Sequence, residues 1–129
     1  MAAPDDIEAG TVVTYERTFT REDVAAFADL SGDRSYHHLV DEQSGPVMVH
    51  GLLTATMPTK VGGDIDYVAR TMDFEFPRPV YTGETVTCEV TIESVTEGEG
   101  RRELDVAWDC TNEDDQRVLT GTSSGVIFG

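Results

Sequence analysis

Basic residues are scarce in this sequence. It has 9 Lys and Arg against 25 Asp and Glu, which gives a formal net charge of −16, and Lys60 is its single lysine. A protein that binds nucleic acid needs a basic face to meet the phosphate backbone. The composition therefore excludes nucleic acid as a partner.

Cysteine is scarce too, and long apolar runs are missing. Cys88 and Cys110 show no CxxC spacing and do not make a disulfide framework. No apolar stretch is long enough to span a bilayer, and MAAPDDIEAG at the start lacks the apolar segment of a secretory signal. We therefore expect a cytoplasmic protein that does not bind membranes. Its 129 residues suit a single domain, 1–129, whose core needs no disulfide or metal.

Acidic residues are abundant but dispersed. Disorder is one explanation for such acidity, yet the apolar residues recur with clear periodicity, which indicates a folded core. An acidic surface keeps a folded protein soluble in concentrated salt, where its self-repulsion is screened. The pattern resembles that of cytoplasmic proteins from extreme halophiles, so we expect a halophilic protein.

The segment TREDVAAFADLSGD predicts a first helix. Thr20 is suited to the N-cap, with Asp23 three residues later in a capping-box position, and Gly32 is suited to the stop. The spacing of the apolar residues predicts a buried stripe of Val24, Phe27 and Leu30. The polar stretch that follows, 34–46, is expected to be a loop.

The segment HGLLTATMPTKVGG predicts a second helix that begins at His50 and stops at Gly62 and Gly63. Its apolar residues surround most of its circumference, which is typical of a buried helix. Pro58 removes a backbone amide and crowds the preceding turn, so we expect a kink or an early end there.

The remaining sequence predicts strands. The first covers 11–18, and the others cover 66–76, 85–95, 103–110 and 117–128. Strict alternation predicts two inward-facing sets, Val86, Cys88, Val90 and Ile92 in one strand and Leu104, Val106, Trp108 and Cys110 in the next. An antiparallel sheet with one wet face needs a cover on its dry face. The prediction is α+β, a curved antiparallel sheet wrapped around one helix.

All three histidines lie close together, two of them in LSGDRSYHHLV and the third in VMVHG. On their own, Asp33 suits an ordinary turn and His38 a solvent-facing loop. Together with an aspartate and a helix start, they also fit a proton-transfer site beside backbone N–H donors. Adjacent histidines in an extended loop point in opposite directions, so we expect no metal at His37, His38, Asp33 and Asp41.

The order of motifs resembles that of the MaoC-like hydratases and dehydratases of the hotdog fold, which include the R-specific enoyl-CoA hydratases. Asp33 and His38 match the Asp/His pair of the family's GDxNPxH motif, and His50-Gly51 matches the HG that opens its central helix. Thr56 falls where the family has a serine, and RPVYTGETV resembles its rPVxxGDtv segment. The resemblance covers nearly the whole chain and implies a hotdog fold.

By this resemblance the protein hydrates a 2-enoyl-CoA to an (R)-3-hydroxyacyl-CoA, or dehydrates the product, as in fatty acid and polyhydroxyalkanoate metabolism. Asp33 and His38 are then the acid/base pair, and the Gly51 N–H stabilises the enolate oxygen. Thr56 and His50 are expected at the substrate. No cofactor is implied beyond the CoA of the substrate.

Few cations are present to meet the phosphates of CoA. Arg34 is the first candidate because it adjoins Asp33, and the others near the motifs are Arg78, Lys60 and Arg70. The family forms dimers that join two sheets, and an open sheet edge needs cover, so a homodimer is expected.

The sequence departs from the family in three places. Ser35-Tyr36 replaces Asn-Pro, His37 occupies a position that is usually aliphatic, and the segment from His38 to His50 is shorter. Two alternatives to a hydratase therefore stay open. One is a hotdog acyl-CoA thioesterase, and the other is a non-catalytic subunit paired with a second hotdog protein.

Overall fold

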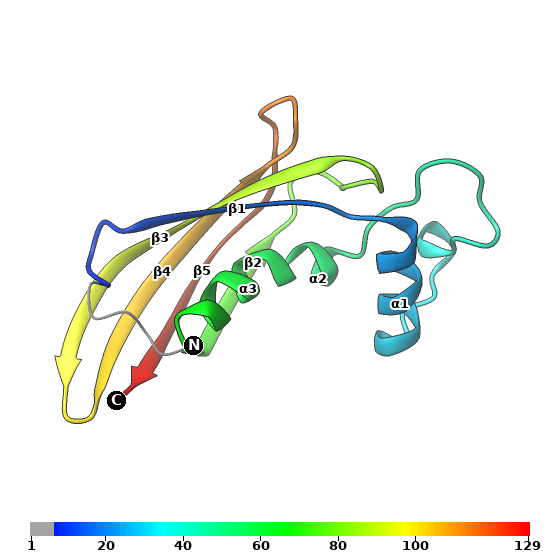
Figure 1. Cartoon of the computed structure of the whole chain (residues 1–129). Helices are drawn as coiled ribbons and strands as arrows, with labels where there is room; N and C mark the ends of the chain where they lie inside the picture. The colour runs from blue at the N-terminus through cyan, green and yellow to red at the C-terminus, as the bar shows by residue number, and fades with distance from the viewer. Residues whose placement is uncertain (1–6) are drawn as a thin grey trace.

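Five antiparallel strands form one curved sheet that wraps around a central helical segment (Figure 1). This computed structural model describes residues 7–129, so most of the acidic MAAPDDIEAG segment lies outside them. The strands are β1 (Val12–Thr18), β2 (Tyr67–Glu75), β3 (Thr85–Gly98), β4 (Arg101–Thr111) and β5 (Arg117–Phe128). Their spatial order is β1-β3-β4-β5-β2, which leaves β1 and β2 at the two edges. The predicted strands and the α+β class are confirmed.

The core follows the alternation of β3 and β4. Every residue predicted to face inward is buried, namely Val86, Cys88, Val90, Ile92, Leu104, Val106, Trp108 and Cys110. Trp108 lies opposite Gly121 of β5, where a Cβ would come within 2.8 Å of the indole and 2.1 Å of the Asp73 carbonyl oxygen. A glycine at this position therefore lets the large indole pack onto the sheet.

Helix α1 (Arg21–Ser31) has the predicted caps. The Thr20 hydroxyl accepts from the Asp23 N–H, the Asp23 carboxylate accepts from the Thr20 N–H, and Gly32 ends the helix with φ 79°. The predicted stripe is wrong at Leu30, which is 85% exposed, whereas Ala28 is buried. Figure 1 shows α1 beside the sheet rather than across its face.

The central helical segment is broken, as Pro58 predicts. Helix α2 (Gly51–Thr54) ends at Ala55, and α3 (Thr56–Asp64) follows at once. Pro58 has no N–H to donate to the carbonyl four residues earlier, that of Thr54, so the regular ladder is interrupted there. The predicted stop is wrong by a residue, since Gly62 and Gly63 lie inside α3. Helix α3 contacts β1, β2 and β3 and thereby covers the sheet.

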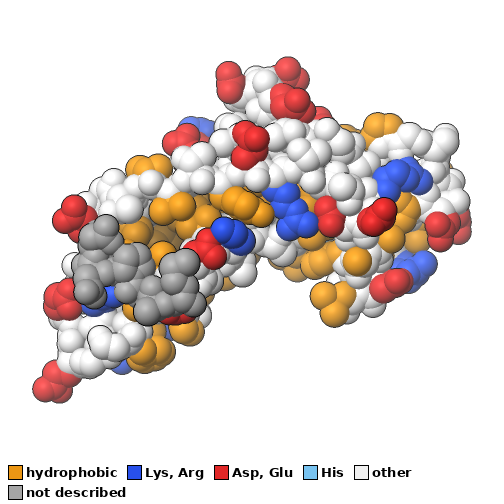
Figure 2. Space-filling view, in the orientation of Figure 1, with side chains coloured by type: hydrophobic (Ala, Val, Ile, Leu, Met, Phe, Trp, Pro, Cys, Tyr) orange, Lys and Arg blue, Asp and Glu red, His pale blue; other side chains and the backbone are white. Residues whose placement is uncertain are grey.

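Acidic side chains are scattered over the visible face of the molecule, with few basic ones among them (Figure 2). Several of the basic ones form exposed ion pairs, such as Arg70 with Glu103 and Arg117 with Asp109. Within residues 7–129, no helix is long and apolar enough to cross a membrane.

Candidate active site

The connection between α1 and α2 brings Asp33, His38 and His50 together. One short 3-10 helix, η1 (Tyr36–His38), lies within it and turns the His38 side chain into the protein. Hydrogen-bonding atoms of these three residues lie within 4.8 Å of one another. The residues that the motifs predict as a group are therefore a group in space.

Asp33 presents an exposed carboxylate held in a fixed orientation. Its Oδ1 accepts from the Ser35 hydroxyl at 2.9 Å and from the Ser35 N–H at 3.2 Å. These two hydrogen bonds hold the pKa of the Asp33 carboxyl below its usual value. Ser35 replaces the family's asparagine and here fixes the orientation of the carboxylate. The other oxygen, Oδ2, is directed at His38.

His38 is buried, with only its Nε2 near Asp33. Its Nδ1 lies 2.8 Å from the Met48 carbonyl oxygen, which only accepts, so Nδ1 carries the proton. Its Nε2 lies 3.9 Å from Asp33 Oδ2, too far for a direct hydrogen bond. With its proton on Nδ1, the neutral form of His38 would present an Nε2 lone pair to the Asp33 carboxylate region.

His50 packs under both of these residues. Its ring stacks on the His38 ring with centroids 3.8 Å apart and planes 16° apart, and Phe27 of α1 covers it at 4.8 Å. Its Nε2 donates to the Asp33 backbone carbonyl at 2.9 Å. The residue is 2% exposed. The His50 side chain is therefore engaged by Asp33 and His38, and its contact with substrate stays a prediction.

The ring geometry of the histidines argues against a shared metal ion. An ion binds in the plane of an imidazole, at a nitrogen lone pair. The ring planes of His38 and His50 are nearly parallel and stacked. No single position close to a nitrogen of each ring therefore lies in both ring planes, as a shared ion would require. One nitrogen of each ring is also engaged by a carbonyl oxygen.

Gly51 is the first residue of α2 and lies at the wall of a surface cleft. We call this the catalytic cleft, after the predicted catalytic residues His38 and Gly51 in its wall; it is lined by His38, Met48, Val49, Gly51, Thr54, Phe76, Arg78, Pro79, Val80 and Val118. A Cβ on Gly51 would lie 2.9 Å from the Phe76 ring, so only glycine fits without a shift. No hydrogen bond described within residues 7–129 uses the Gly51 N–H. That N–H is therefore available to a ligand.

Thr54, and not Thr56, contributes to the catalytic cleft. The Thr56 hydroxyl donates to the Leu53 carbonyl at 2.5 Å, the alternative expected of a threonine within a helix. Sequence reasoning missed Thr54, Met48 and Phe76. Phe76 had a signal, because it directly follows β2 and only Pro77 separates it from the RPV motif.

Arg34 does not line the catalytic cleft. It pairs with Asp29 at 2.5 Å and lines a neighbouring hollow, which shares His38 with the cleft and also contains Asp41 and Glu42. Such an acidic hollow repels phosphate, so the structure does not favour Arg34 as the cation for CoA. Arg78 is exposed, lines the catalytic cleft, and has no described ion pair among residues 7–129.

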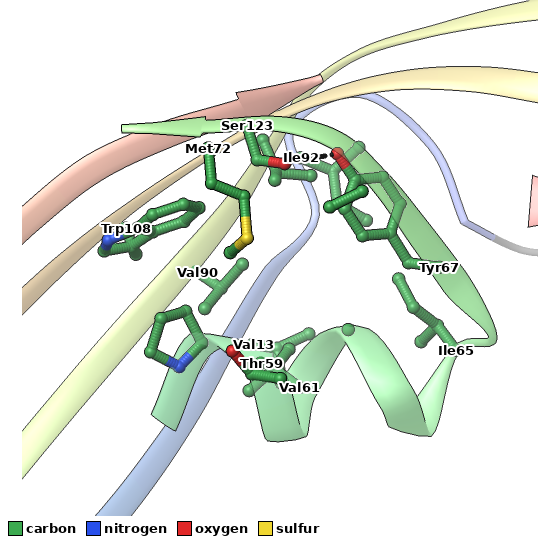
Figure 3. Close-up of a pocket in the computed structure, with 14 residues that line it drawn as sticks. Val13, Thr59, Val61, Ile65, Tyr67, Met72, Val90, Ile92, Trp108 and Ser123 are labelled. Carbon is green, nitrogen blue, oxygen red and sulfur yellow. Dashed lines mark hydrogen bonds between the residues drawn. The ribbon is translucent and has the colours of Figure 1, made fainter. Parts of the chain in front are cut away.

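A separate apolar pocket lies between α3 and the sheet (Figure 3). Its volume is about 150 Å³. The labelled side chains of Val61 from α3, Val90 from β3, Trp108 from β4 and Met72 from β2 surround it, and Tyr67 bonds Ser123 at 2.8 Å on its sheet side. A row of aromatic rings leads from this pocket to the cleft, from Trp108 through Phe74 to Phe76.

Comparison with known proteins gives matches over most of the chain. A family model described as MaoC like domain matches residues 5–113. The chain is 30% identical to a 3-hydroxybutyryl-CoA dehydratase of Methylorubrum extorquens, an alignment that covers 91% of this chain and 78% of that enzyme.

Among solved structures, the (R)-hydratase from A. caviae involved in PHA biosynthesis superposes with a TM-score of 0.81 at 23% identity, covering 98% of this chain and all (100%) of that one. The ChsH1-ChsH2 complex from Mycobacterium tuberculosis gives a TM-score of 0.75 at 16% identity, covering 96% of this chain and 99% of that one. At these identities the superpositions concern the fold, and they confirm the predicted hotdog fold.

Proposed function

The chain belongs to the MaoC-like domain family, and we propose that it adds water to a 2-enoyl-CoA to give an (R)-3-hydroxyacyl-CoA, or catalyses the reverse dehydration. The observation that carries this proposal is the 3.9 Å separation of Asp33 Oδ2 and His38 Nε2. It is too long for a direct hydrogen bond, and one water oxygen fits within about 2.8 Å of both atoms.

The proton acceptors are in the right state for hydration. Asp33, whose pKa lies below its usual value, is ionised near neutral pH, and the Met48 carbonyl accepts from Nδ1–H of His38. Water gives one proton to this pair while its oxygen bonds to C3 of the enoyl group. The electrons of the C2=C3 bond move toward the thioester, and the pair then returns the proton to C2.

The enolate oxygen formed in this step needs a hydrogen-bond donor. We assign this role to the Gly51 N–H, which lies in the same cleft as His38 and has no other described partner. No metal and no cofactor beyond the CoA of the substrate enters the proposed reaction. The thioester carbonyl would then lie between Gly51 and the bridging water.

The remaining cleft features suit the two ends of an acyl-CoA. We expect Arg78 to meet a phosphate of CoA, in preference to Arg34, because Arg78 lines the cleft and Arg34 pairs with Asp29. The acyl tail would follow the aromatic row into the apolar pocket. A cavity of about this volume takes a group about the size of benzene, so short acyl chains are favoured.

A homodimer is the proposed assembly. Edge strand β2 exposes Val68 and Met72, which are 49% and 41% exposed, and the unpaired edge of an exposed strand invites another strand. Since Met72 also lines the apolar pocket, a second copy along β2 would close it. Light scattering should show a dimer at micromolar concentration; a folded monomer there would contradict this.

The test of function is an assay with crotonyl-CoA in molar KCl. Purified protein should form (R)-3-hydroxybutyryl-CoA, identified by chiral analysis, and should release no free CoA. Release of CoA would identify a thioesterase instead. If the folded protein leaves crotonyl-CoA and longer enoyl-CoAs unchanged, it is the non-catalytic subunit of a hetero-oligomer.

Repeating the assay in millimolar KCl tests the proposed halophilic character, because unscreened acidic repulsion weakens the fold.

A further inference from the structure

His50 makes contacts that its position at a helix entry does not require. As the N-cap of α2, it makes no side-chain capping bond to the helix it begins. Its side chain instead reaches back 17 residues to the Asp33 carbonyl. The His50 side chain therefore binds the loop that carries Asp33 and not its own helix.

The contacts of His50 join the two proposed catalytic residues. One is a hydrogen bond of 2.9 Å to the backbone of Asp33, and the other is a ring stack of 3.8 Å on His38. Phe27 packs against the same ring, with centroids 4.8 Å apart and planes 59° apart, and so limits its movement. A shift of His50 would therefore change the position of Asp33 and that of His38 together.

The hydrogen bond also defines the tautomer of His50. A carbonyl oxygen only accepts, so the proton is on Nε2. The Nδ1 atom is buried and has no hydrogen-bond partner among residues 7–129. The neutral Nε2–H form is the one that satisfies the bond to Asp33 without placing an unpaired charge in a buried site.

We propose that His50 is a positioning residue, whose neutral imidazole sets the separation of Asp33 and His38 through its bond to the Asp33 carbonyl and its stack on the His38 ring. The residue is 2% exposed, so it acts through these two residues. This inference rests on the proposed function for its kinetic consequences, but the tautomer and the contacts do not depend on the reaction. A misplacement of about 1 Å in such a pair lowers catalysis by about 10²-fold.

Two substitutions separate the hydrogen bond from the packing. His50→Phe keeps a flat ring against His38 but loses the N–H, so kcat should fall about 10²-fold with KM within about twofold. His50→Gln places an N–H at nearly the same distance along the side chain and should recover about tenfold of that loss. The control is Val86→Ala, which destabilises the core at a buried site away from these contacts. It should leave kcat unchanged.

The inference is overturned if His50→Phe keeps kcat within about twofold of the unaltered protein, or if Gln is no better than Phe. A readout without substrate covers the case in which a variant does not fold or the protein is not a hydratase. The chain has 3 histidines, so ¹⁵N histidine spectra are readily assigned. We expect Nε2–H at His50 and Nδ1–H at His38; Nδ1–H at His50, or exchange between tautomers, would contradict the proposal.

Discussion

The predicted catalytic residues and the apolar pocket lie along the same central helical segment but are built in different ways. Asp33, His38 and His50 come from one connection, and hydrogen bonds within that connection hold them. The pocket is lined by side chains from α3 and from all five strands, which meet only when the sheet has formed. In the proposed function, contacts within one connection therefore position the acid/base pair, and packing between distant parts of the chain selects the acyl group.

Removing proton transfer should affect the cleft alone and gives the largest expected effect. Asp33→Asn and His38→Gln keep the size and hydrogen bonding of each side chain, so each should lower kcat by about 10²–10⁴. Asp33 is exposed, so the thermal midpoint of Asp33→Asn should stay near that of the unaltered protein. Stopped assays with crotonyl-CoA measure the rate.

The double variant tests whether the two residues act on one water. Because the loss of either partner removes the bridged site, the double variant should be little slower than the slower single variant. Independent roles would instead multiply the two losses. That outcome would contradict the shared water, even if both single variants are slow.

These two regions also show how far the sequence alone leads. The pair Asp33 and His38 could be predicted because a motif fixes their spacing within one loop, and the alternation of β3 predicts its buried face. The contact of His50 with the Asp33 carbonyl could not be predicted. It depends on the path of the connection, which brings two residues 17 positions apart into contact. Likewise Leu30 is exposed and Thr54 replaces Thr56 at the cleft, since packing around each helix decides its buried side.

The size of the apolar pocket should change selectivity for the acyl chain without changing the chemistry. Val61→Ala widens the pocket, and Val61→Leu narrows it. The ratio of kcat/KM for octenoyl-CoA to that for crotonyl-CoA should rise about tenfold in the first and fall in the second. Val86→Ala removes the same atoms from a buried site outside the pocket and should leave the ratio unchanged. An equal change in Val86→Ala would point to general loosening of the core.

Charge reversal at the mouth of the cleft should have a smaller effect, confined to binding. Arg78→Glu places an acid where we expect a phosphate of CoA, so KM should rise about fivefold with kcat nearly unchanged. Arg34→Glu should change KM less, because Arg34 faces Asp29. Arg101→Glu is the matched control, since Arg101 is exposed at the β3–β4 turn, at the other end of the sheet (Figure 1). If all three raise KM equally, net charge and not position decides binding.

The smallest expected effect concerns the pH at which Asp33 loses its charge. The Ser35 hydroxyl is the largest cause of the lowered pKa of Asp33, followed by the Ser35 N–H. Ser35→Ala removes only the first, so the pKa of Asp33 should rise toward its usual value. A carboxyl with a lowered pKa stabilises the fold above its unfolded pKa, and this contribution is lost as pH falls through the folded pKa. In the variant the contribution is smaller, and its loss begins at higher pH.

The same change should appear in catalysis, because the ionised carboxylate is the form that accepts a proton from water. The acid limb of the profile of kcat/KM against pH should therefore move to higher pH in Ser35→Ala, with the plateau near neutral pH little changed. Ser31→Ala is the control, because the Ser31 hydroxyl accepts from the Asp33 backbone N–H at 3.0 Å and does not touch the carboxylate. A shift in Ser35→Ala alone ties the charge of Asp33 to this one hydrogen bond. Equal shifts in both variants would mean that the position of the loop, and not this hydrogen bond, sets the pH of the acid limb.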